Sequence, residues 1–321
     1  MANEIINYSD PATRLTDKKL TQLEKRIGEA YADAANDIEK TIAKYWADFI
    51  ERDDKMQIDL RNGKITKEYY KQWRLNQIGR GRRLEALRDD LAQRIFEVNE
   101  VATAYINDAT PGIYTLNRAY VGYTLAQVGH HAAFTIWDEQ TIKRLIMTKP
   151  QLMPYYPPAR AIKRGIDLKY SKKVITNAIT TGILTGKPLP KIANDLQRKL
   201  ITMSRDSANR AARTAFTGAQ NGGRVAGMSA ALDMGIDVQK QWLTCGDARV
   251  RKSHIALDGE IVPVKETFWN GLLYPGDPDG EPAEVYNCRC TLLYVVDGES
   301  VLDKQDQLDS NFNKYLEDNG I

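Results

Sequence analysis

Four side chains toward the C-terminal end of the sequence have the chemistry to bind one metal ion: Cys245, His254, Cys288 and Cys290. Thiolates and imidazoles are the usual ligands of tetrahedral structural zinc. Residues i and i+2 of an extended segment lie on one face, so we expect Cys288 and Cys290 to direct both sulfurs to the same side. One interpretation is therefore a Cys₃His zinc site. The spacing, with one residue between the paired cysteines, differs from the standard zinc motifs.

A simpler interpretation of these residues stays open. Buried cysteines also pack as small hydrophobic residues, and His254 would then be a hydrogen-bonded core histidine. The chain has three cysteines, all between residues 245 and 290, and the odd number argues against a disulfide framework. In a reducing compartment such clustering favours metal binding or packing over cross-links.

The polar residues around the cysteines are consistent with either an ion-pair network or a catalytic site. Asp247, Arg249 and Arg251 alternate along the chain, so a strand here would present all three charges on one face. A metal-dependent nuclease would use Asp247, His254 and Asn287. The other two histidines lie in a different part of the sequence, which leaves such a site poor in ligands. We favour an ion-pair network and no enzymatic activity, and Asn287 could equally cap a turn.

Long amphipathic helices must carry this segment. Apolar residues recur in steps of three and four from Thr16 to about Asp53, and again between residues 66 and about 107. Thr110-Pro111-Gly112 is expected to end the second helix and close an antiparallel pair. The sequence therefore predicts a flexible N-terminus over residues 1–15 and a helical arm over residues 16–150.

The middle of the chain is also predicted to be helical. A proline-rich stretch from Lys149 to Pro158 indicates a linker, and the region of residues 151–236 is predicted to be helical after it. Ser204 or Ser207 is expected to cap the last of them, whose regularly spaced alanines permit close packing against a neighbour.

The sequence changes character after residue 236. Val238 to Thr244 and Cys290 to Val296 are predicted strands, and Asp258-Gly259 indicates a hairpin between two further segments. We expect residues 237–296 to form a small loop-rich module and residues 297–321 an acidic tail. The predicted fold class is thus α+β, mostly α-helical with long amphipathic helices, plus a small C-terminal module containing a few antiparallel strands.

The net charge of +3 conceals two basic clusters. Residues 160–214 hold 13 Lys and Arg against 3 Asp and Glu, and residues 71–88 are similarly basic. Such surfaces suit sequence-independent contact with the phosphates of double-stranded DNA, although a solvated helix face explains either cluster equally well. The candidate contact residues are Lys71, Arg74, Arg80, Arg82, Arg83, Lys172 and Lys173.

The sequence gives no indication of a membrane protein. No apolar run approaches the roughly 18 residues needed to cross a bilayer. The opening residues lack the basic and apolar regions of a secretory signal, so we expect folding in a cytoplasm.

Residues 242–291 resemble the phage Mu F-like minor head proteins, also called head morphogenesis proteins. The resemblance depends on a tryptophan in a strand, a D-x-R-V-R-x-S-H segment, a Leu-Asp-Gly turn and a closing N-C-R-C-T segment. The helices of residues 170–236 are similar to those that precede this module in the family. The motif residues are Trp242, Asp247, Arg249, Arg251, Asp258, Gly259, Asn287 and Arg289.

This resemblance implies a structural component of a tailed-phage head. Such a protein would lie inside the virion head beside the portal, after assembly in the host cytoplasm, with the portal protein and the major capsid or scaffold interior as partners. Many relatives carry two cysteines at the positions of Arg251 and His254, so here Cys245 would have to supply a fourth ligand. Some relatives carry an additional toxin domain, which the short acidic tail of this sequence is too small to form. A DNA-binding module unrelated to phage heads is a further alternative.

Overall fold

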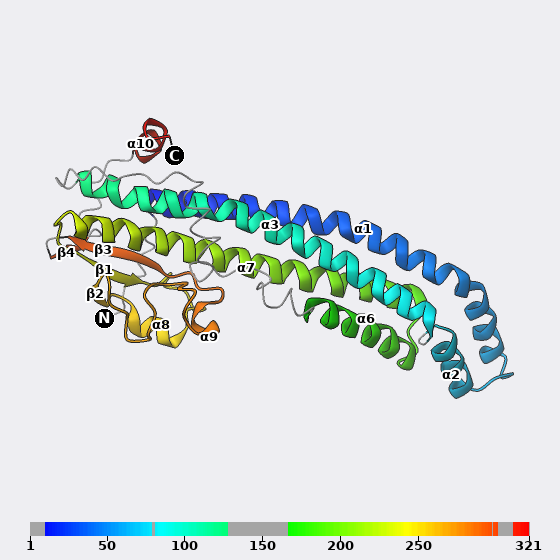
Figure 1. The fold of residues 1–321 in the computed structure, drawn as a ribbon. Helices are drawn as coiled ribbons and strands as arrows, with labels where there is room; N and C mark the ends of the chain where they lie inside the picture. Colours follow the sequence, from blue (N-terminus) through cyan, green and yellow to red (C-terminus); the bar gives the residue numbers. More distant parts are fainter. Residues whose placement is uncertain (1–9, 79–80, 128–165, 297, 301–310, 321) are drawn as a thin grey trace. The chain divides into compact units, whose positions relative to one another are not determined.

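The computed structural model describes residues 10–78, 81–127, 166–296, 298–300 and 311–320. The chain forms two compact units. Unit 1 comprises residues 1–24, 105–156 and 210–321, and unit 2 comprises residues 25–104 and 157–209. Three long helices contribute residues to both units (Figure 1): α1 (Pro11–Arg61), α3 (Arg82–Gln127) and α7 (Leu189–Asp233). The predicted fold class is confirmed. No helix among the described residues is both long and apolar enough to span a membrane.

Helix α1 begins five residues earlier than the periodicity predicted. The backbone N–H of Thr13 donates to the Asp10 carboxylate over 2.7 Å, which pairs one of the first amides of the helix. Pro11 occupies the first turn, where the missing N–H of proline costs nothing. Residues 11–15, which the sequence placed in a flexible N-terminus, are therefore helical. A proline next to a capping aspartate was the overlooked indication.

Unit 2 is held together by apolar helix packing. Its core joins α1 and α3 to α2 (Lys67–Gln77), α6 (Ile166–Leu184) and the first part of α7. Figure 1 shows α6 lying beside this part of α7. One polar group of this core is an ion pair in which Arg74 Nε lies 3.2 Å from Asp53 Oδ1, and both side chains are almost fully buried.

Helix α3 passes through the point where the sequence predicted a turn. Pro111 lies inside the helix, where it removes a backbone hydrogen bond at a cost of about 3 kcal/mol. Buried apolar residues continue on both sides of it, including Ile106, Ile113 and Leu116. The predicted end at Thr110-Pro111-Gly112 is wrong, because this packing stabilises a continuous helix. The rest of the predicted helical region after residue 127, and the linker, lie outside the described residues.

Helix α7 is likewise continuous, without a break at Ser204 or Ser207. In unit 1 it passes very close to α3. A Cβ atom at Gly223 would lie 2.3 Å from the carbonyl oxygen of Tyr114, and one at Gly227 would lie 2.7 Å from Cβ of Val121. Glycine is therefore needed at both positions despite its low helix propensity.

Unit 1 contains an antiparallel four-stranded sheet in the order β2-β1-β3-β4. The strands are β1 (Val238–Leu243), β2 (Ile261–Pro263), β3 (Thr291–Val296) and β4 (Glu299–Ser300). The two predicted strands correspond to β1 and β3, which pair with Trp242 opposite Leu292. All six residues of β3 are buried, which explains the continuous apolar run. The sheet lies along the last part of α7 (Figure 1).

Three segments of the C-terminal region have a different structure from the one that the sequence predicted. The residues before Asp258 form helix α8 (Lys252–Leu257), so Asp258-Gly259 connects a helix to β2 and does not close a β-hairpin. The Asp247–Arg251 stretch is a turn and not a strand, so its charges do not share one strand face. The tail region contains β4 and helix α10 (Phe312–Asp318), whose Phe312 packs against Tyr120 and Tyr123 of α3.

Candidate metal centre

Three of the four predicted zinc ligands meet in the interior of unit 1. His254 comes from α8, and Cys288 and Cys290 come from the segment that enters β3. One ligand atom from each lies within 4.8 Å of the other two, and all three residues are buried. Asn287 has a φ of 57°, so the chain bends sharply just before the cysteine pair. Both sulfurs point toward one imidazole, as the i and i+2 spacing predicted, although neither cysteine belongs to the regular strand.

The distances within this group fit a tetrahedral zinc ion. His254 Nδ1 lies 3.6 Å from Cys288 Sγ and 3.4 Å from Cys290 Sγ. Zn–S bonds of about 2.3 Å and Zn–N bonds of about 2.1 Å, at tetrahedral angles, place sulfur and nitrogen about 3.6 Å apart. Two sulfurs and one nitrogen are also the donors that zinc prefers. The two nitrogen–sulfur distances therefore match those expected around a zinc ion.

The opposite side of the imidazole is held by a carboxylate that the sequence did not reveal. Glu284 of helix α9 (Pro282–Val285) places Oε2 2.9 Å from His254 Nε2. The same oxygen accepts a 2.9 Å hydrogen bond from Ser253 Oγ. A carboxylate at this nitrogen orients a histidine whose other nitrogen binds a metal. Nothing in the sequence distinguished Glu284 from its acidic neighbours in the loop.

The two cysteines differ in their electrostatics. A hydrogen bond from Cys290 lowers the pKa of the Cys288 thiol well below its usual value, and His254 acts in the same direction. The same contact with Cys288, together with burial, raises the pKa of the Cys290 thiol. The arrangement thus favours one thiolate beside a shared proton. Such a thiolate binds a cation readily.

Cys245, the fourth predicted ligand, does not belong to this group. It lies in the loop after β1, where the backbone N–H of Thr244 donates to Asp258 Oδ1 over 2.7 Å. Cys245 and Cys290 both line one cavity of about 450 Å³, so Cys245 borders the same cavity as one of the three converging ligands. The structure therefore brings three predicted ligands together and leaves Cys245 beside them.

Asp247 forms an ion pair and does not belong to a metal group in the described part of the chain. Its carboxylate accepts two hydrogen bonds from the guanidinium of Arg289, at 2.5 and 2.7 Å. This interaction holds the pKa of Asp247 well below its usual range. Asp247 Oδ1 also accepts the backbone N–H of Arg249, whose own side chain is largely exposed. The pair ties the loop after β1 to the cysteine segment.

The geometry does not assemble the alternative catalytic set. His254 is 1% exposed and both of its ring nitrogens face protein groups. Asn287 is exposed at the bend, and its backbone N–H donates to Thr214 Oγ1 over 2.9 Å. Asp247 is engaged by Arg289. A general base needs access to its substrate, which a buried histidine of this kind lacks.

The remaining motif residues stabilise the module. Trp242 is fully buried and packs edge-on against the His254 ring, with centroids 5.1 Å apart. Gly259 has a φ of 82° and donates its N–H to the Trp242 carbonyl over 2.8 Å. Arg251 donates to the carbonyl of Tyr286, which joins the start of α8 to the end of α9. Each motif residue therefore has a definite structural contact.

Helix α7 carries a buried polar stripe that holds the cysteine segment. Thr217 Oγ1 donates to the Cys288 carbonyl over 2.8 Å. Asn221 donates to the Cys290 carbonyl over 3.2 Å and accepts the N–H of Leu292 over 2.8 Å. The stripe comprises Thr214, Thr217, Asn221 and Arg224. Its steps of three and four residues within an alanine-rich helix were a usable signal that sequence reasoning missed.

Arg224, the last residue of this stripe, forms buried contacts with three other elements of unit 1. Its guanidinium lies 2.7 Å from Asp10 Oδ2 and donates to the Leu292 carbonyl over 2.8 Å. It also donates to Asn117 Oδ1 over 3.2 Å. Arg224 and Asp10 are both buried. One cation thus connects the start of α1, helix α3 and strand β3.

The predicted DNA-contact residues lie in unit 2 and fall into three groups. Arg74 is 1% exposed and paired with Asp53, so its assignment to a phosphate contact is wrong. Arg80 lies outside the described residues. The others are at least partly accessible on α2, α3 and α6: Lys71, Arg82, Arg83, Lys172 and Lys173. Lys172 lies 3.2 Å from Asp89, so this lysine is partly neutralised.

With this geometry established, the chain can be placed among known proteins. The family model described as "Phage Mu protein F like protein" matches residues 173–293. The matched segment includes α7, the β1–β3 pair and the three converging ligands. The chain carries a Mu F-like region. The resemblance predicted from the sequence is thereby confirmed over this segment.

Two curated proteins are similar to this chain. It is 24% identical over 287 residues to "Minor head protein GP7" of Bacillus phage SPP1, which covers 88% of this chain and 85% of that protein. It is 35% identical over 148 residues to "NAD(+)--arginine ADP-ribosyltransferase EFV" of Enterococcus faecalis (strain ATCC 700802 / V583). That second alignment covers 44% of this chain and 30% of the enzyme. No solved structure matches the chain.

Proposed function

We propose that this chain is a structural minor head protein of a tailed phage, positioned inside the head beside the portal. The observation that carries the proposal is the alignment with the SPP1 minor head protein, which extends over most of both chains. Long packed helices and a small C-terminal module are consistent with a structural component of a head. The major capsid or scaffold interior is the second expected contact.

The alternative of an enzyme receives little support from the site. The alignment with the ADP-ribosyltransferase covers 30% of that protein, so its activity does not transfer with it. Asp247 is engaged by Arg289, and His254 is buried between two sulfurs and Glu284. Plasmid nicking in the presence of Mg²⁺ or Mn²⁺ tests the nuclease alternative. Activity in the wild type that His254→Ala removes would support it.

Portal association is tested by co-expression with the portal protein encoded in the same genome. We expect the two proteins to co-purify, with a small fixed number of these chains per portal oligomer. Size-exclusion chromatography with light scattering gives the stoichiometry. Elution of this chain apart from an intact portal oligomer, at micromolar concentrations and moderate salt, would contradict the proposed association.

We further propose that His254, Cys288 and Cys290 hold a structural zinc ion, with Cys245 as the nearest candidate for a fourth ligand. The support is the spacing of the three ligand atoms and the carboxylate on the far side of the imidazole. Zinc would add cohesion to a loop-rich segment, and its binding would release the thiol protons of the cysteine ligands. The competing arrangement is a metal-free thiolate–imidazole cluster with the same packing.

Elemental analysis of protein purified without chelator separates these two arrangements. We expect one zinc per chain, lost in Cys288→Ser. Chelation should then increase hydrogen exchange in residues 238–296 while peptides from α2 and α6 keep their protection. Cys245→Ser tests the fourth position, where a weaker but occupied site would indicate a water or another ligand. A folded module with less than about a tenth of an equivalent of zinc per chain, even after incubation with ZnCl₂, would exclude the metal.

Nonspecific contact with packaged DNA is the last part of the proposal. It is supported by the accessible basic residues of unit 2, among them Arg82, Arg83 and Lys173. Binding of a random-sequence duplex should weaken steeply as salt rises from about 50 to about 200 mM. Arg82→Gln/Arg83→Gln should reduce the slope of log affinity against log salt by about 2. Sequence-selective binding, or affinity independent of salt, would contradict it.

A further inference from the structure

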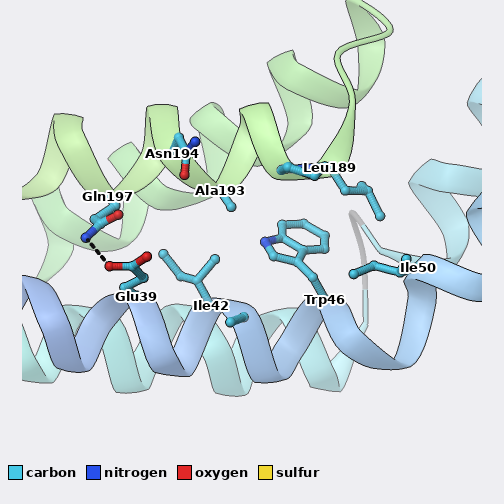
Figure 2. A pocket seen from close by; sticks show the side chains of 10 residues that line it. Glu39, Ile42, Trp46, Ile50, Leu189, Ala193, Asn194 and Gln197 are labelled. Carbon is cyan, nitrogen blue, oxygen red and sulfur yellow. Dashed lines mark hydrogen bonds between the residues drawn. The ribbon is translucent and has the colours of Figure 1, made fainter.

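A pocket of about 230 Å³ opens between α1 and α7 within unit 2 (Figure 2). Most of its wall is apolar. Ile42, Trp46 and Ile50 line it from α1, and Leu189 and Ala193 line it from α7. Glu39, Asn194 and Gln197 form a polar edge at one end. This pocket is separate from the metal centre, which belongs to unit 1.

Small side chains create the space. Ala43 and Ala193 line the pocket, whereas the neighbouring core of unit 2 is filled by large buried residues such as Tyr45 and Phe49. Protein interiors seldom keep a void larger than a water molecule, because side chains interdigitate. Two alanines on the facing helices therefore leave room for a group from outside the chain.

A buried polar atom in this wall lacks a partner. Trp46 is 3% exposed, and its indole nitrogen has no hydrogen-bond partner within the described residues. Figure 2 shows this nitrogen facing the space between Ile42 and Ala193. A buried tryptophan normally pairs its N–H, and an indole can only donate. The pocket thus combines an apolar volume with one unpaired donor.

The polar edge adds a constraint of charge. Gln197 Nε2 donates to the Ala35 carbonyl over 3.2 Å and lies 3.5 Å from a Glu39 carboxylate oxygen. Glu39 is the charged residue among those that line the pocket. An anionic ligand would be repelled by this carboxylate, whereas a neutral ligand would not. The remaining wall offers no charge to pair with an ion.

We propose that this pocket binds a neutral group the size of one aromatic ring that carries a hydrogen-bond acceptor, which pairs with the indole N–H of Trp46. A dry cavity of about 150 Å³ accepts benzene, so the larger volume here leaves room for a carbonyl substituent. The indole nitrogen is itself covered by protein atoms, so the acceptor reaches it when a neighbouring side chain of the wall moves aside. A free small molecule and a side chain of a protein partner share this chemistry.

The full-length protein labelled with ¹⁵N allows a direct test. The chain has five tryptophans, and the indole N–H resonance of Trp46 is assigned by comparison with Trp46→Phe. Titration with acetophenone should shift the Trp46 resonance downfield in a saturable manner. Ethylbenzene, of similar shape but without an acceptor, should bind at least fivefold more weakly. N-acetylphenylalaninamide presents the same ring on a peptide and distinguishes the two sources of ligand by which probe binds more tightly.

Two leucine variants decide whether the pocket is responsible. Ala193→Leu should fill the space and weaken binding of the better probe at least tenfold. Ala32→Leu makes the same change at an exposed position of α1 outside the pocket and should leave binding unchanged. The proposal is overturned if the Trp46 resonance stays unmoved by both acceptor probes up to their solubility limits. It is also overturned if Ala193→Leu and wild type bind equally.

Discussion

Both units of this molecule bury apolar cores, and unit 1 adds a buried polar stripe that binds an irregular segment. Unit 2 relies on interdigitated apolar side chains from five helices, with a single buried Asp53–Arg74 pair among its described residues. In unit 1 the C-terminal part of α7 binds the cysteine segment through hydrogen bonds from Thr217, Asn221 and Arg224. Apolar packing tolerates changes of shape, whereas a buried hydrogen bond requires its partner in one place. The positions of the hydrogen-bonded groups in unit 1 are therefore constrained more tightly than the apolar side chains of unit 2.

This difference is consistent with the kind of structure that each unit must hold. A helical bundle satisfies its backbone hydrogen bonds internally, so side chains need only fill space. The segment of residues 287–290, just before β3, is irregular, and its amides and carbonyls need partners from elsewhere. Helix α7 supplies those partners. The polar stripe thus compensates for the lack of regular structure next to the candidate metal centre.

The largest effect should come from breaking the buried cation of each unit. Arg224→Met leaves Asp10 buried and unpaired, and Arg74→Met does the same to Asp53. We expect each change to cost about 3–5 kcal/mol, with the greater loss for Arg224 because it also binds Asn117 and Leu292. Hydrogen exchange followed by mass spectrometry should locate each loss in its own unit.

A charge-neutral double variant provides the control. Arg74→Met combined with Asp53→Asn should recover part of the stability lost in Arg74→Met, because no unpaired charge remains buried. If Arg224→Met and Arg74→Met each lowered protection from hydrogen exchange equally in both units, the effect of each buried pair would not be confined to its own unit.

A buried lysine gives unit 1 an alkaline pH dependence. Lys240 is fully buried and donates to the carbonyls of Val264 and Glu266. Burial lowers its pKa from 10.5 to about 8. Between these values the unfolded chain binds more protons, so this residue makes the folded state more stable as pH rises. Below about pH 8 the cost of burying the charge is fully present.

Urea unfolding of wild type and Lys240→Met at about pH 7 and about pH 10 isolates this contribution. The wild type should gain about 2 kcal/mol relative to the variant over that interval. Groups common to both proteins cancel in the comparison. A difference in stability that stays constant between the two pH values would mean that Lys240 titrates normally in the folded protein.

A pair of adjacent glycines gives the smallest but cleanest test. Gly223→Ala would place Cβ 2.3 Å from the Tyr114 carbonyl oxygen, and we expect a loss of about 1–3 kcal/mol. At Gly222 the nearest atom to a new Cβ is Tyr274 Oη at 3.4 Å, so Gly222→Ala should be neutral or stabilising by up to about 1 kcal/mol. Thermal unfolding of the two variants measures the contrast. Equal melting temperatures would mean that α3 and α7 do not approach this closely.

Much of the fold followed from periodicity alone. Apolar residues in steps of three and four predicted α1 and α3, and the segments VQKQWLT and CTLLYVV predicted β1 and β3. The i and i+2 spacing placed Cys288 and Cys290 on one side. These predictions were right because burial of an apolar face is encoded locally, in residues that are close along the chain.

Errors arose where a local rule met a distant partner. Pro111 was expected to end a helix, yet packing on both sides keeps α3 continuous. Arg74 was assigned to a surface because arginine clusters are usually solvated, but Asp53 from another helix draws it into the core. The residues before Asp258 were assigned to a strand and form α8. In each case tertiary contacts overrode a correct intrinsic preference.

Local patterns in the sequence were enough to predict the class of fold, the resemblance to the Mu F-like proteins and the presence of ligand-type residues. Which ligands meet became known from the packed structure: His254, Cys288 and Cys290 converge, Cys245 lies beside them, and Glu284 joins from a separate short helix. The packed structure also disclosed the pocket beside Trp46. Spacing along a chain fixes which face a side chain occupies, whereas the distance between two faces depends on how separate elements pack.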